Sequence, residues 1–475
     1  MTLIIISIIA TLAFFAVLGY GVRNAFGWVY LPVLMLVPAR AVFDLPGLPD
    51  LTPGRAAALG LIAGTIANGR FRQLIPDRRL IDLVALLPVL TFAVSYGQVT
   101  DFKGFYSRLA ILAMDWGCPY FFTRVLITDM VALRTVLKPF TIFACVTALF
   151  AIYESRMAFR LAPYLWNSIG VVLEPIPHYG SWRWGFLRAH ATFYGPIQLG
   201  TFFAMATPLA RLWGVLDPRR NKWSWLSTLL SAGGCIASMS RGPIVVLIVV
   251  TIIAWTVAKP RQSTFLVALA LLISSSPFLY EMATEEVKYT SARVEATGNT
   301  AGESGHYRVA LLLIYGKEIA NVGCWGDPYL VGREYEAAWS IDNAYLYLFL
   351  IGGWFGGGSV CLLILITYFR TLRRLMNATD HDRKVLAILL AAFAGMTGSM
   401  ANVWFAIDYA PFFWWCQAIL INIVTLYSVR NHTIADSLNR VQTAPQRFGC
   451  DCGGPAANAA YARPHLDRYL PTKDP

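Results

Sequence analysis

Residues 340–358 read SIDNAYLYLFLIGGWFGGG, a stretch that passes from polar residues directly into an apolar, glycine-rich run. The apolar run continues to about residue 368, which is long enough for a helix that crosses a hydrocarbon core of about 30 Å. Asp342 and Asn343 stand immediately ahead of this run. Ionisable groups are costly at a membrane and are usually functional there. The stretch therefore predicts a transmembrane helix with a functional residue at its N-terminal end.

The composition extends this prediction to the whole chain. Of 475 residues, 57% are hydrophobic and 14% are charged, and the mean hydropathy is +0.54. A soluble domain of this composition could not cover its apolar surface with polar groups. We therefore predict an all-α, polytopic integral membrane protein of about 12–13 transmembrane helices, with spans near residues 2–20, 26–43, 55–69, 80–97, 107–127, 137–154, 195–215, 224–239, 243–258, 263–280, 343–368, 385–405 and 410–428.

Basic residues fall in short clusters between the apolar runs. Short loops rich in Lys and Arg stay cytoplasmic, which predicts that side for Arg70, Arg72, Arg78 and Arg79, for Arg219, Arg220 and Lys222, and for Arg370, Arg373, Arg374, Arg383 and Lys384. Alternation then places the N-terminus, the 155–194 loop, the turn at 240–242 and the large 281–342 loop on the periplasmic side. We expect a transmembrane domain over residues 1–430 and a disordered cytoplasmic tail over 431–475.

Several function classes lack support in the sequence. The net charge of +12 is spread over loops, which argues against nucleic-acid binding. No P-loop, GxGxxG unit or HExxH motif is present, so ATP hydrolysis and zinc proteolysis are not indicated. The cysteines are mostly isolated in apolar runs, and the Cys450–Cys452 pair has no second pair to complete a metal site. The first run, 2–20, lacks a basic start and a cleavage site, so we expect it to remain as a helix.

Polar residues of four segments fall together on the predicted periplasmic side. They are Arg188, Arg241, Arg308 and the Asp342–Asn343 pair. Structural alternatives exist for most of them. Arg188 could snorkel to the interface, Arg308 could pair with a nearby glutamate, and Asp342 or Asn343 could cap the following helix.

Arg241 has no comparable structural explanation. It sits in SRGP, between runs 224–239 and 243–258, with almost no polar loop to carry it into water. Gly242 and Pro243 suit a tight turn followed by the first turn of a helix, whose N-terminus attracts anions. A guanidinium fork matches two oxygens of a phosphate group, so this position predicts phosphate or pyrophosphate binding.

The order of these motifs resembles the O-antigen ligase and polymerase superfamily, which comprises the WaaL ligases and the Wzy-type polymerases. The sequence carries R-x3-TFxxPxxLG from Arg188, SRGP at 240–243, NVGCWG at 321–326 after Arg308, and DN-x2-L-x5-GGxxGG from Asp342. The resemblance spans about residues 185–365. It implies a multi-pass protein of the bacterial inner membrane that handles a glycan carried on undecaprenyl diphosphate.

The resemblance also implies roles for individual residues. Arg188 and Arg241 would hold the lipid pyrophosphate, Arg308 would help to hold the donor, and Asn343 would contact substrate. Ligases usually have His-Asn where this chain has Asp342-Asn343, and this departure favours the polymerase branch. Asp342 becomes the candidate catalytic base, with His178, His190 and His306 ranked below it. No metal or other cofactor is expected if arginines carry the diphosphate charge.

The function expected from the sequence is polymerisation of undecaprenyl-diphosphate-linked oligosaccharides into an exopolysaccharide or O-antigen at the periplasmic face. The runner-up is a ligase that transfers the glycan to lipid A core or to a protein. A polysaccharide transporter or flippase is the alternative from a different class, and it predicts charges distributed through mid-membrane helices. Expected partners are the lipid-linked donor and acceptor glycans, the bilayer, and chain-length regulator and flippase proteins.

Overall fold

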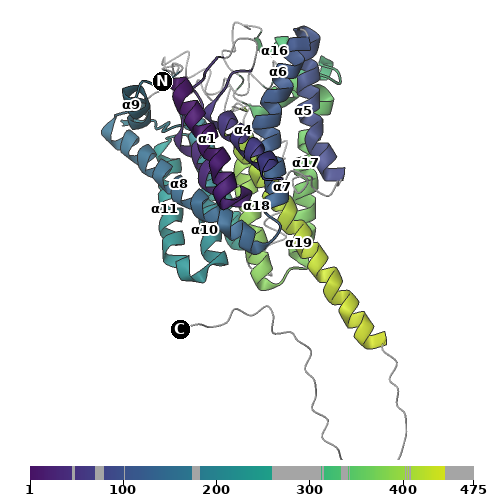
Figure 1. The fold of residues 1–475 in the computed structure, drawn as a ribbon. Helices are drawn as coiled ribbons and strands as arrows, with labels where there is room; N and C mark the ends of the chain where they lie inside the picture. The colour runs from purple at the N-terminus through teal and green to yellow at the C-terminus, as the bar shows by residue number, and fades with distance from the viewer. Residues whose placement is uncertain are drawn as a thin grey trace, which may run out of the picture. The chain divides into compact units, whose positions relative to one another are not determined.

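A computed structural model of the chain shows a bundle of helices with one short pair of strands (Figure 1). The structure describes residues 1–44, 49–69, 80–100, 102–173, 182–183, 185–258, 312, 315–332, 341, 343–401, 403, 405 and 408–443. Residues Met1–Ser428 form one compact unit, and Val429–Pro475 form another. The statements below concern the first unit unless α19 is named.

The N-terminal part of the bundle consists of long helices and of helices with one irregular turn. Its elements are α1 (Thr2–Tyr20), α2 (Val22–Ala25), η1 (Phe26–Tyr30), α3 (Leu31–Leu36), α4 (Pro53–Ala67), α5 (Leu80–Val99), α6 (Phe102–Leu112), η3 (Ala113–Gly117), α7 (Cys118–Leu126) and α8 (Met130–Met157). The π-helical turns η1 and η3 each interrupt an otherwise continuous helix, a feature that often occurs near functional sites.

The second part begins with a short helix and a pair of two-residue strands. Its elements are α9 (Leu161–Ser168), β1 (Trp182–Arg183), β2 (Phe186–Leu187), α10 (Pro196–Leu216), η4 (Pro218–Arg220), α11 (Asn221–Ala237), α12 (Arg241–Val257), α16 (Tyr329–Gly332), α17 (Ala344–Met376), α18 (Asp380–Met400) and α19 (Ala410–Thr443). Helix α19 continues past residue 430, where the sequence predicted a tail, because no proline or glycine interrupts it before Pro445. Residues 444–475 lie outside the described part.

The apolar helices confirm an all-α, multi-pass membrane protein. Seven described helices are long and apolar enough to cross a membrane, and Val22–Leu36 and Arg241–Val257 are shorter apolar helices. Each predicted span among the described residues overlaps a helix, but the helix predicted at 26–43 covers Val22–Leu36, and α17 and α19 extend beyond their predicted ends. The span at 263–280 lies outside the described residues. The total of 12–13 spans and the side on which each loop lies stay predictions.

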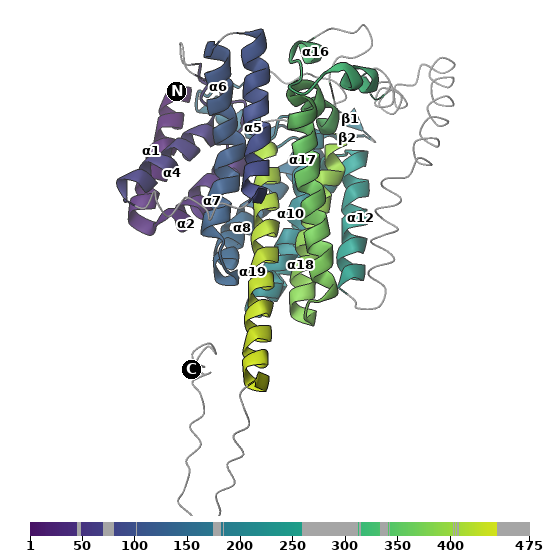
Figure 2. The ribbon, with the colours of Figure 1, turned by 90° about the vertical axis from the view of Figure 1, so that its right-hand side faces the viewer.

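The two ends of the bundle carry different loops (Figures 1 and 2). We call the end with α9 and the first residues of α10 and α12 the upper end, as it is drawn in Figure 1. The Thr2 side chain is hydrogen-bonded to the Val172 N–H there, so α1 also begins at this end. The lower end carries the basic turns between α10 and α11 and between α17 and α18. The 155–194 loop and the turn at 240–242 therefore share one end, and the basic turns share the other.

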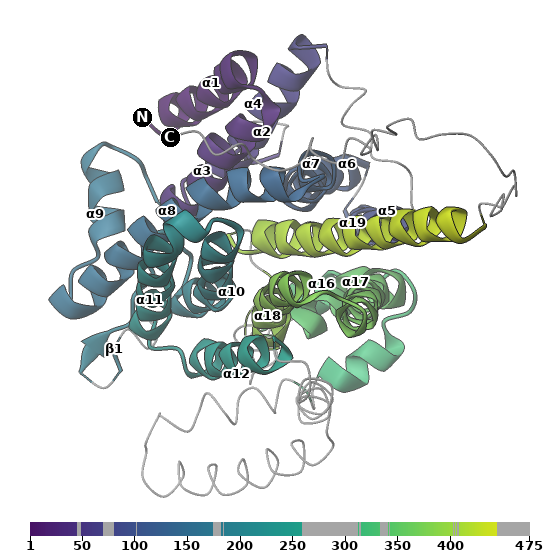
Figure 3. The same cartoon turned by 90° about the horizontal axis from the view of Figure 1, so that it is seen from below.

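Helix α10 is the central helix of the second part. It packs against α8, α11, α12 and α18, and Figure 3, seen from the lower end, shows it among them. Glycines allow this close packing. A Cβ on Gly395 of α18 would come within 2.7 Å of the Ala204 carbonyl oxygen, and one on Gly200 would meet Pro243 of α12 at 2.8 Å. Small residues at helix contacts are the usual way in which membrane helices approach each other.

Buried ion pairs connect the N-terminal helices. Arg55 of α4 pairs with Asp115 of η3 at 2.7 Å, and Arg124 of α7 pairs with Asp82 of α5 at 2.8 Å, with all four side chains largely buried. Tyr120 also donates to Asp82, at 2.9 Å. A charge inside a membrane protein is tolerated when a partner neutralises it, so these pairs fix the packing of α4, α5 and α7.

A break in α17 determines how its first turns are held. Gly353 leaves helical geometry, with φ 62° and ψ −163°. The N–H groups of Trp354 and Phe355 donate to the carbonyls of Gly323 and Cys324, and the Asp327 N–H donates to the Leu350 carbonyl. Segment 323–327 therefore satisfies backbone groups that the break releases, as a membrane protein requires. The NVGCWG and GGxxGG motifs are thus in direct contact.

Substitution of Gly353 tests this break. In Gly353→Ala, the new Cβ would lie 2.4 Å from the Cys324 carbonyl oxygen, in a backbone conformation that is almost exclusive to glycine. We expect the variant to lose about 3 kcal/mol or more of stability, measured as a lower melting temperature of the purified protein in detergent.

Gly358→Ala is the matched control, because a Cβ there meets nothing within 4 Å and alanine favours a helix. Its melting temperature should equal or exceed that of the wild type. Equal melting temperatures for the Gly353 and Gly358 variants would contradict the described break.

Candidate functional site

A hairpin and a tight turn bring two of the predicted arginines together at the upper end. Strands β1 and β2 pair antiparallel, and the Arg188 guanidinium that follows them donates to Ser240 Oγ at 3.1 Å. Arg183 donates to the Met239 carbonyl at 2.8 Å. Arg188 is therefore bonded to the residue that directly precedes Arg241, so that these predicted residues of the pyrophosphate site share one local structure.

The SRGP sequence explains the shape of this turn. Ser240 is the N-cap residue of α12 with extended backbone angles, and its side chain makes no cap hydrogen bond. Its hydroxyl instead donates to the Ser238 carbonyl and accepts from Arg188. Met239 has a φ of 50°, a conformation that is uncommon for a residue with a side chain and that often marks a functional turn. Arg241 is exposed at the positive end of the α12 dipole.

A buried glutamate holds the segment after Arg188. Glu154, near the end of α8, accepts hydrogen bonds from the Ala191 N–H at 2.7 Å and the His190 N–H at 3.3 Å. Its other oxygen pairs with Arg160 at 3.0 Å. Ala191 has a φ of 49°, which costs roughly 1–2 kcal/mol for a residue other than glycine. The Glu154 carboxyl group therefore stabilises an unfavourable backbone conformation at the upper end.

His190, whose backbone N–H donates to Glu154, has an imidazole that is neutral near pH 7. Burial lowers the pKa of its imidazole well below the ordinary value, and the charges of Arg160, Arg40 and Arg188 lower it further. Its Nδ1 is buried and has no hydrogen-bond partner among the described residues. A neutral imidazole in this position can accept or donate one hydrogen bond.

Asp408, in the connection between α18 and α19, is the other acid of this region. Its Oδ2 accepts the Tyr194 N–H at 2.7 Å. Burial raises the pKa of its carboxyl to about 6, against the opposing effects of the Tyr194 amide and of Arg40. Asp408 thus links the α18–α19 connection to the segment that leads from Arg188 into α10.

Several arginines gather in this region. They are Arg40, Arg156, Arg160, Arg183, Arg188 and Arg241, and the acids Glu154 and Asp408 lie among them, with Glu154 paired to Arg160. Guanidinium groups that are partly shielded from water bind phosphate oxygens strongly. Chemically, the arrangement can hold an anion at the end of the bundle and stabilise negative charge that develops there.

Of the remaining predicted residues, the structure describes Asn343. Asn343 is the N-cap of α17, and its Oδ1 accepts the N–H groups of Tyr345 at 3.0 Å and Leu346 at 3.2 Å. The capping alternative is therefore confirmed for Asn343, whose Nδ2 is the part of the side chain not used by the cap. Asp342 and Arg308 lie outside the described residues, as do His178 and His306.

Tyr345 and Tyr347, near the start of α17, are neighbours of Tyr409, which follows Asp408 in the chain. Burial raises the pKa of the Tyr409 phenol, and its neighbours Asp408, Tyr345 and Tyr347 raise it further. The Tyr345 hydroxyl also donates to the Thr397 carbonyl near the end of α18, at 2.8 Å. The first turn of α17, which follows Asp342 and Asn343, is therefore near the same upper region as Asp408.

Sequence reasoning missed Arg40, Glu154 and Asp408. Each stands at or near the end of a predicted apolar run, where an ionisable residue is itself a signal of function or of pairing. The signal was available, but the partners come from distant parts of the chain. Glu154 and Ala191 lie 37 positions apart, and Tyr194 and Asp408 lie 214 apart.

Two cavities among the described residues lie away from the arginine pair. One, of about 20 Å³, is lined by residues that include Thr52, Asp115 and Asp408, and it is large enough for about one water molecule. The other, of about 350 Å³, lies at the lower end. Neither of these two cavities is lined by Arg188 or Arg241.

Comparison with known protein families finds no match to this chain, and comparison with curated proteins finds none either. The resemblance to O-antigen ligases and polymerases therefore rests on the sequence motifs alone.

The raised pKa of Asp408 gives a testable pH dependence. Because the folded-state pKa is about 6 and the ordinary value is 3.8, the stability that this group contributes is present at low pH and is lost as the pH rises through 6. Asp408→Asn keeps the oxygen that accepts the Tyr194 N–H and removes the titration. Relative to this variant, the wild type should lose about 2–3 kcal/mol between pH 4 and pH 8, measured by melting in detergent. A stability difference that is constant over this range would show that Asp408 is not desolvated.

Proposed function

We propose that the chain is a membrane glycosyltransferase of the bacterial inner membrane that polymerises oligosaccharide units carried on undecaprenyl diphosphate. The reaction would take place at the periplasmic face, where we place the upper end of the bundle. It would require no metal, because arginines would neutralise the diphosphate. The product would be an exopolysaccharide or O-antigen chain.

The observation that carries the proposal is the bond between Arg188 and Ser240, next to Arg241. These residues come from two motifs that are separated by about fifty positions, and the motif resemblance gives both the same role. The positive end of α12 points to the same place and adds to the attraction for an anion. The contact between segment 323–327 and the α17 break supports the proposal further, since it joins two other motifs of the resemblance.

In the proposed reaction, a hydroxyl oxygen of the acceptor sugar forms a bond to the anomeric carbon of a lipid-linked donor. The bond between that carbon and the diphosphate oxygen breaks, and the electron pair leaves with undecaprenyl diphosphate. The hydroxyl proton passes to a base. Arginines lower the barrier because they bind the diphosphate most strongly when its charge has developed.

Asp342 is the proposed base, and Asn343 the proposed substrate contact. The cap of α17 supports this division of roles, because the Asn343 oxygen already holds the helix and Asp342 is not needed for it. His190 is the alternative base. Its neutral imidazole can accept a proton in principle, but its low pKa makes it a weak base.

A ligase with the same donor chemistry is the second candidate. It would use the same arginines and differ in the acceptor molecule, which residues of the upper loops would select. A transporter or flippase gains some support from the buried pairs Arg55–Asp115 and Arg124–Asp82, because charges within helices are typical of transport pathways. Each of these charges is already neutralised by its partner, which favours a structural role.

Replacement of Arg241 tests the proposed diphosphate site. Arg241→Ala should abolish long glycan chains in a complemented deletion strain, while the protein stays in the membrane at the wild-type level. Removal of a charge-stabilising group of this kind usually costs a factor of about 100–1,000 in rate. Arg241→Lys should restore activity only in part, because an ammonium lacks the two-pronged geometry. Chain length is read from the glycan ladder on a gel.

Arg219→Ala is the matched control, since it removes an exposed arginine at the lower end. It should leave the ladder unchanged. Asp342→Asn should also shorten or abolish the ladder, because it removes the base and leaves the Asn343 cap intact. A wild-type ladder from Arg241→Ala would refute the diphosphate role, and one from Asp342→Asn would move the base to His190.

A further inference from the structure

A basic pocket opens at the lower end of the bundle, opposite the proposed reaction site. It has a volume of about 350 Å³ and is lined by Trp28, Val131, Arg134, Thr135, Lys138, Trp213, Asp217 and Arg220. These residues come from η1, α8, α10 and the η4 turn. Along α8, Arg134 and Glu154 are 20 positions apart, about 30 Å, so the pocket and the upper arginines are separated by about the thickness of a hydrocarbon core.

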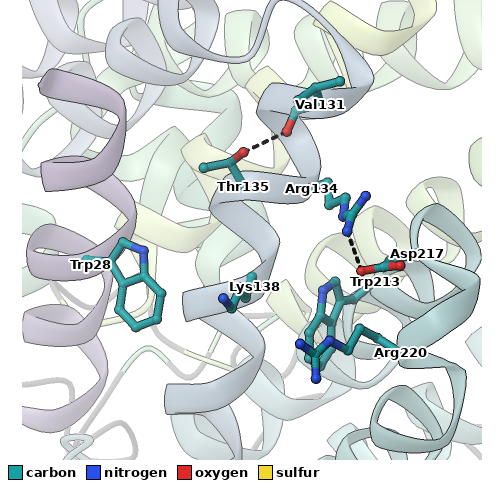
Figure 4. A pocket seen from close by; sticks show the side chains of 8 residues that line it. All are labelled: Trp28, Val131, Arg134, Thr135, Lys138, Trp213, Asp217 and Arg220. Carbon is teal, nitrogen blue, oxygen red and sulfur yellow. Dashed lines mark hydrogen bonds and ion pairs between the residues drawn. The ribbon is translucent and has the colours of Figure 1, made fainter. Parts of the chain in front are cut away.

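The side chains of the pocket leave unbalanced positive charge. Arg134 forms an ion pair with Asp217, whose carboxylate is nearly buried. Lys138 and Arg220 also line the pocket, and neither has a carboxylate within ion-pair distance among the described residues. The pair of Arg134 and Asp217 is drawn as a dashed line in Figure 4. The pocket therefore offers two cations that no described carboxylate neutralises.

Tryptophans place the pocket at the level of the lipid headgroups. Figure 4 shows Lys138 between Trp28 and Trp213, and the Lys138 Nζ lies 5.8 Å from the centre of the Trp28 ring. Trp223 and Trp225, in the first turns of α11, are more than half exposed. Tryptophan is enriched where the apolar and the polar layers of a membrane meet, so a ligand in this pocket would have its charged part at the membrane surface.

Helix α11, which begins directly after Arg220 of the pocket, carries exposed apolar side chains. The exposed side chains Leu226, Leu229 and Ile236 lie on one face of α11, which packs directly against α8. Their spacing of three and seven residues keeps them on that face. A molecule with a phosphate head in the pocket could therefore lay its hydrocarbon chains along α11.

We propose that the basic pocket binds the headgroup of an anionic phospholipid of the inner, basic side of the membrane. Arg220 would hold phosphate oxygens through its guanidinium fork, and Lys138 would add a second charge. With two unbalanced cations, the pocket prefers a headgroup with two phosphates, such as cardiolipin, to one with a single phosphate. Basic pockets between membrane helices are a known means of recognising such lipids. This site is independent of the proposed glycosyl transfer.

The test measures lipid binding to the purified full-length protein in a neutral detergent. Cardiolipin, phosphatidylglycerol and phosphatidylcholine are titrated separately, and binding is followed by native mass spectrometry. The double variant Lys138→Gln/Arg220→Gln is compared with Arg219→Gln/Lys222→Gln, which removes the same charge from adjacent exposed residues that do not line the pocket. Each basic residue near an anionic lipid contributes about a factor of five, so the pocket variant should bind cardiolipin about thirtyfold more weakly and the control less than twofold.

The expected order for the wild type is cardiolipin, then phosphatidylglycerol, with phosphatidylcholine much weaker. Equal losses in the two double variants would overturn the proposal, because they would show attraction by the whole basic surface. Displacement of cardiolipin by inorganic phosphate at similar concentration would overturn the lipid assignment in favour of a soluble anion. If the double variant does not fold, Arg220→Gln alone replaces it, since this side chain is exposed on a surface turn, and a loss below twofold would then refute the site.

Discussion

The structure depends on one constraint: a chain that crosses lipid must satisfy its backbone groups and its charges from within. Arg55 and Asp115 meet this requirement, and so do Arg124 and Asp82. At the break in α17, the same constraint explains why segment 323–327 lies against residues 350–355, because the freed N–H and carbonyl groups need partners. In these three places, a buried polar group has its partner in a distant part of the chain.

The two ends of the bundle use their acids differently. At the upper end, Glu154 and Asp408 accept backbone N–H groups of the segment that follows Arg188. At the lower end, Asp217 balances Arg134 but leaves Lys138 and Arg220. The two ends also differ in shape. Arg188 and Arg241 lie at a turn and at the start of a helix, whereas Lys138 and Arg220 line a pocket.

Much of the fold could be predicted from the sequence, because hydrophobic runs of helical length need no partner to be recognised. Most of the described long helices overlap their predicted spans, although α17 and α19 run farther than predicted and the helix predicted at 26–43 ends at Leu36. The contact of Arg188 with the SRGP turn agrees with their predicted placement at one end. The break at Gly353 was not predictable in this way. A glycine-rich run permits a break, but only the distant carbonyls of Gly323 and Cys324 determine where it falls. The roles of Glu154 and Asp408 likewise depend on partners that no local pattern contains.

The most direct measurement is the analysis of lipid-linked and surface glycans in cells from which the gene for this chain has been deleted. If the arginines at the upper end serve to polymerise lipid-linked units, single repeat units should accumulate on undecaprenyl diphosphate, and the long chains should disappear. Long chains that remain of normal length but stay on the carrier lipid would contradict polymerisation and identify a ligase. An unchanged glycan profile would contradict glycosyl transfer altogether.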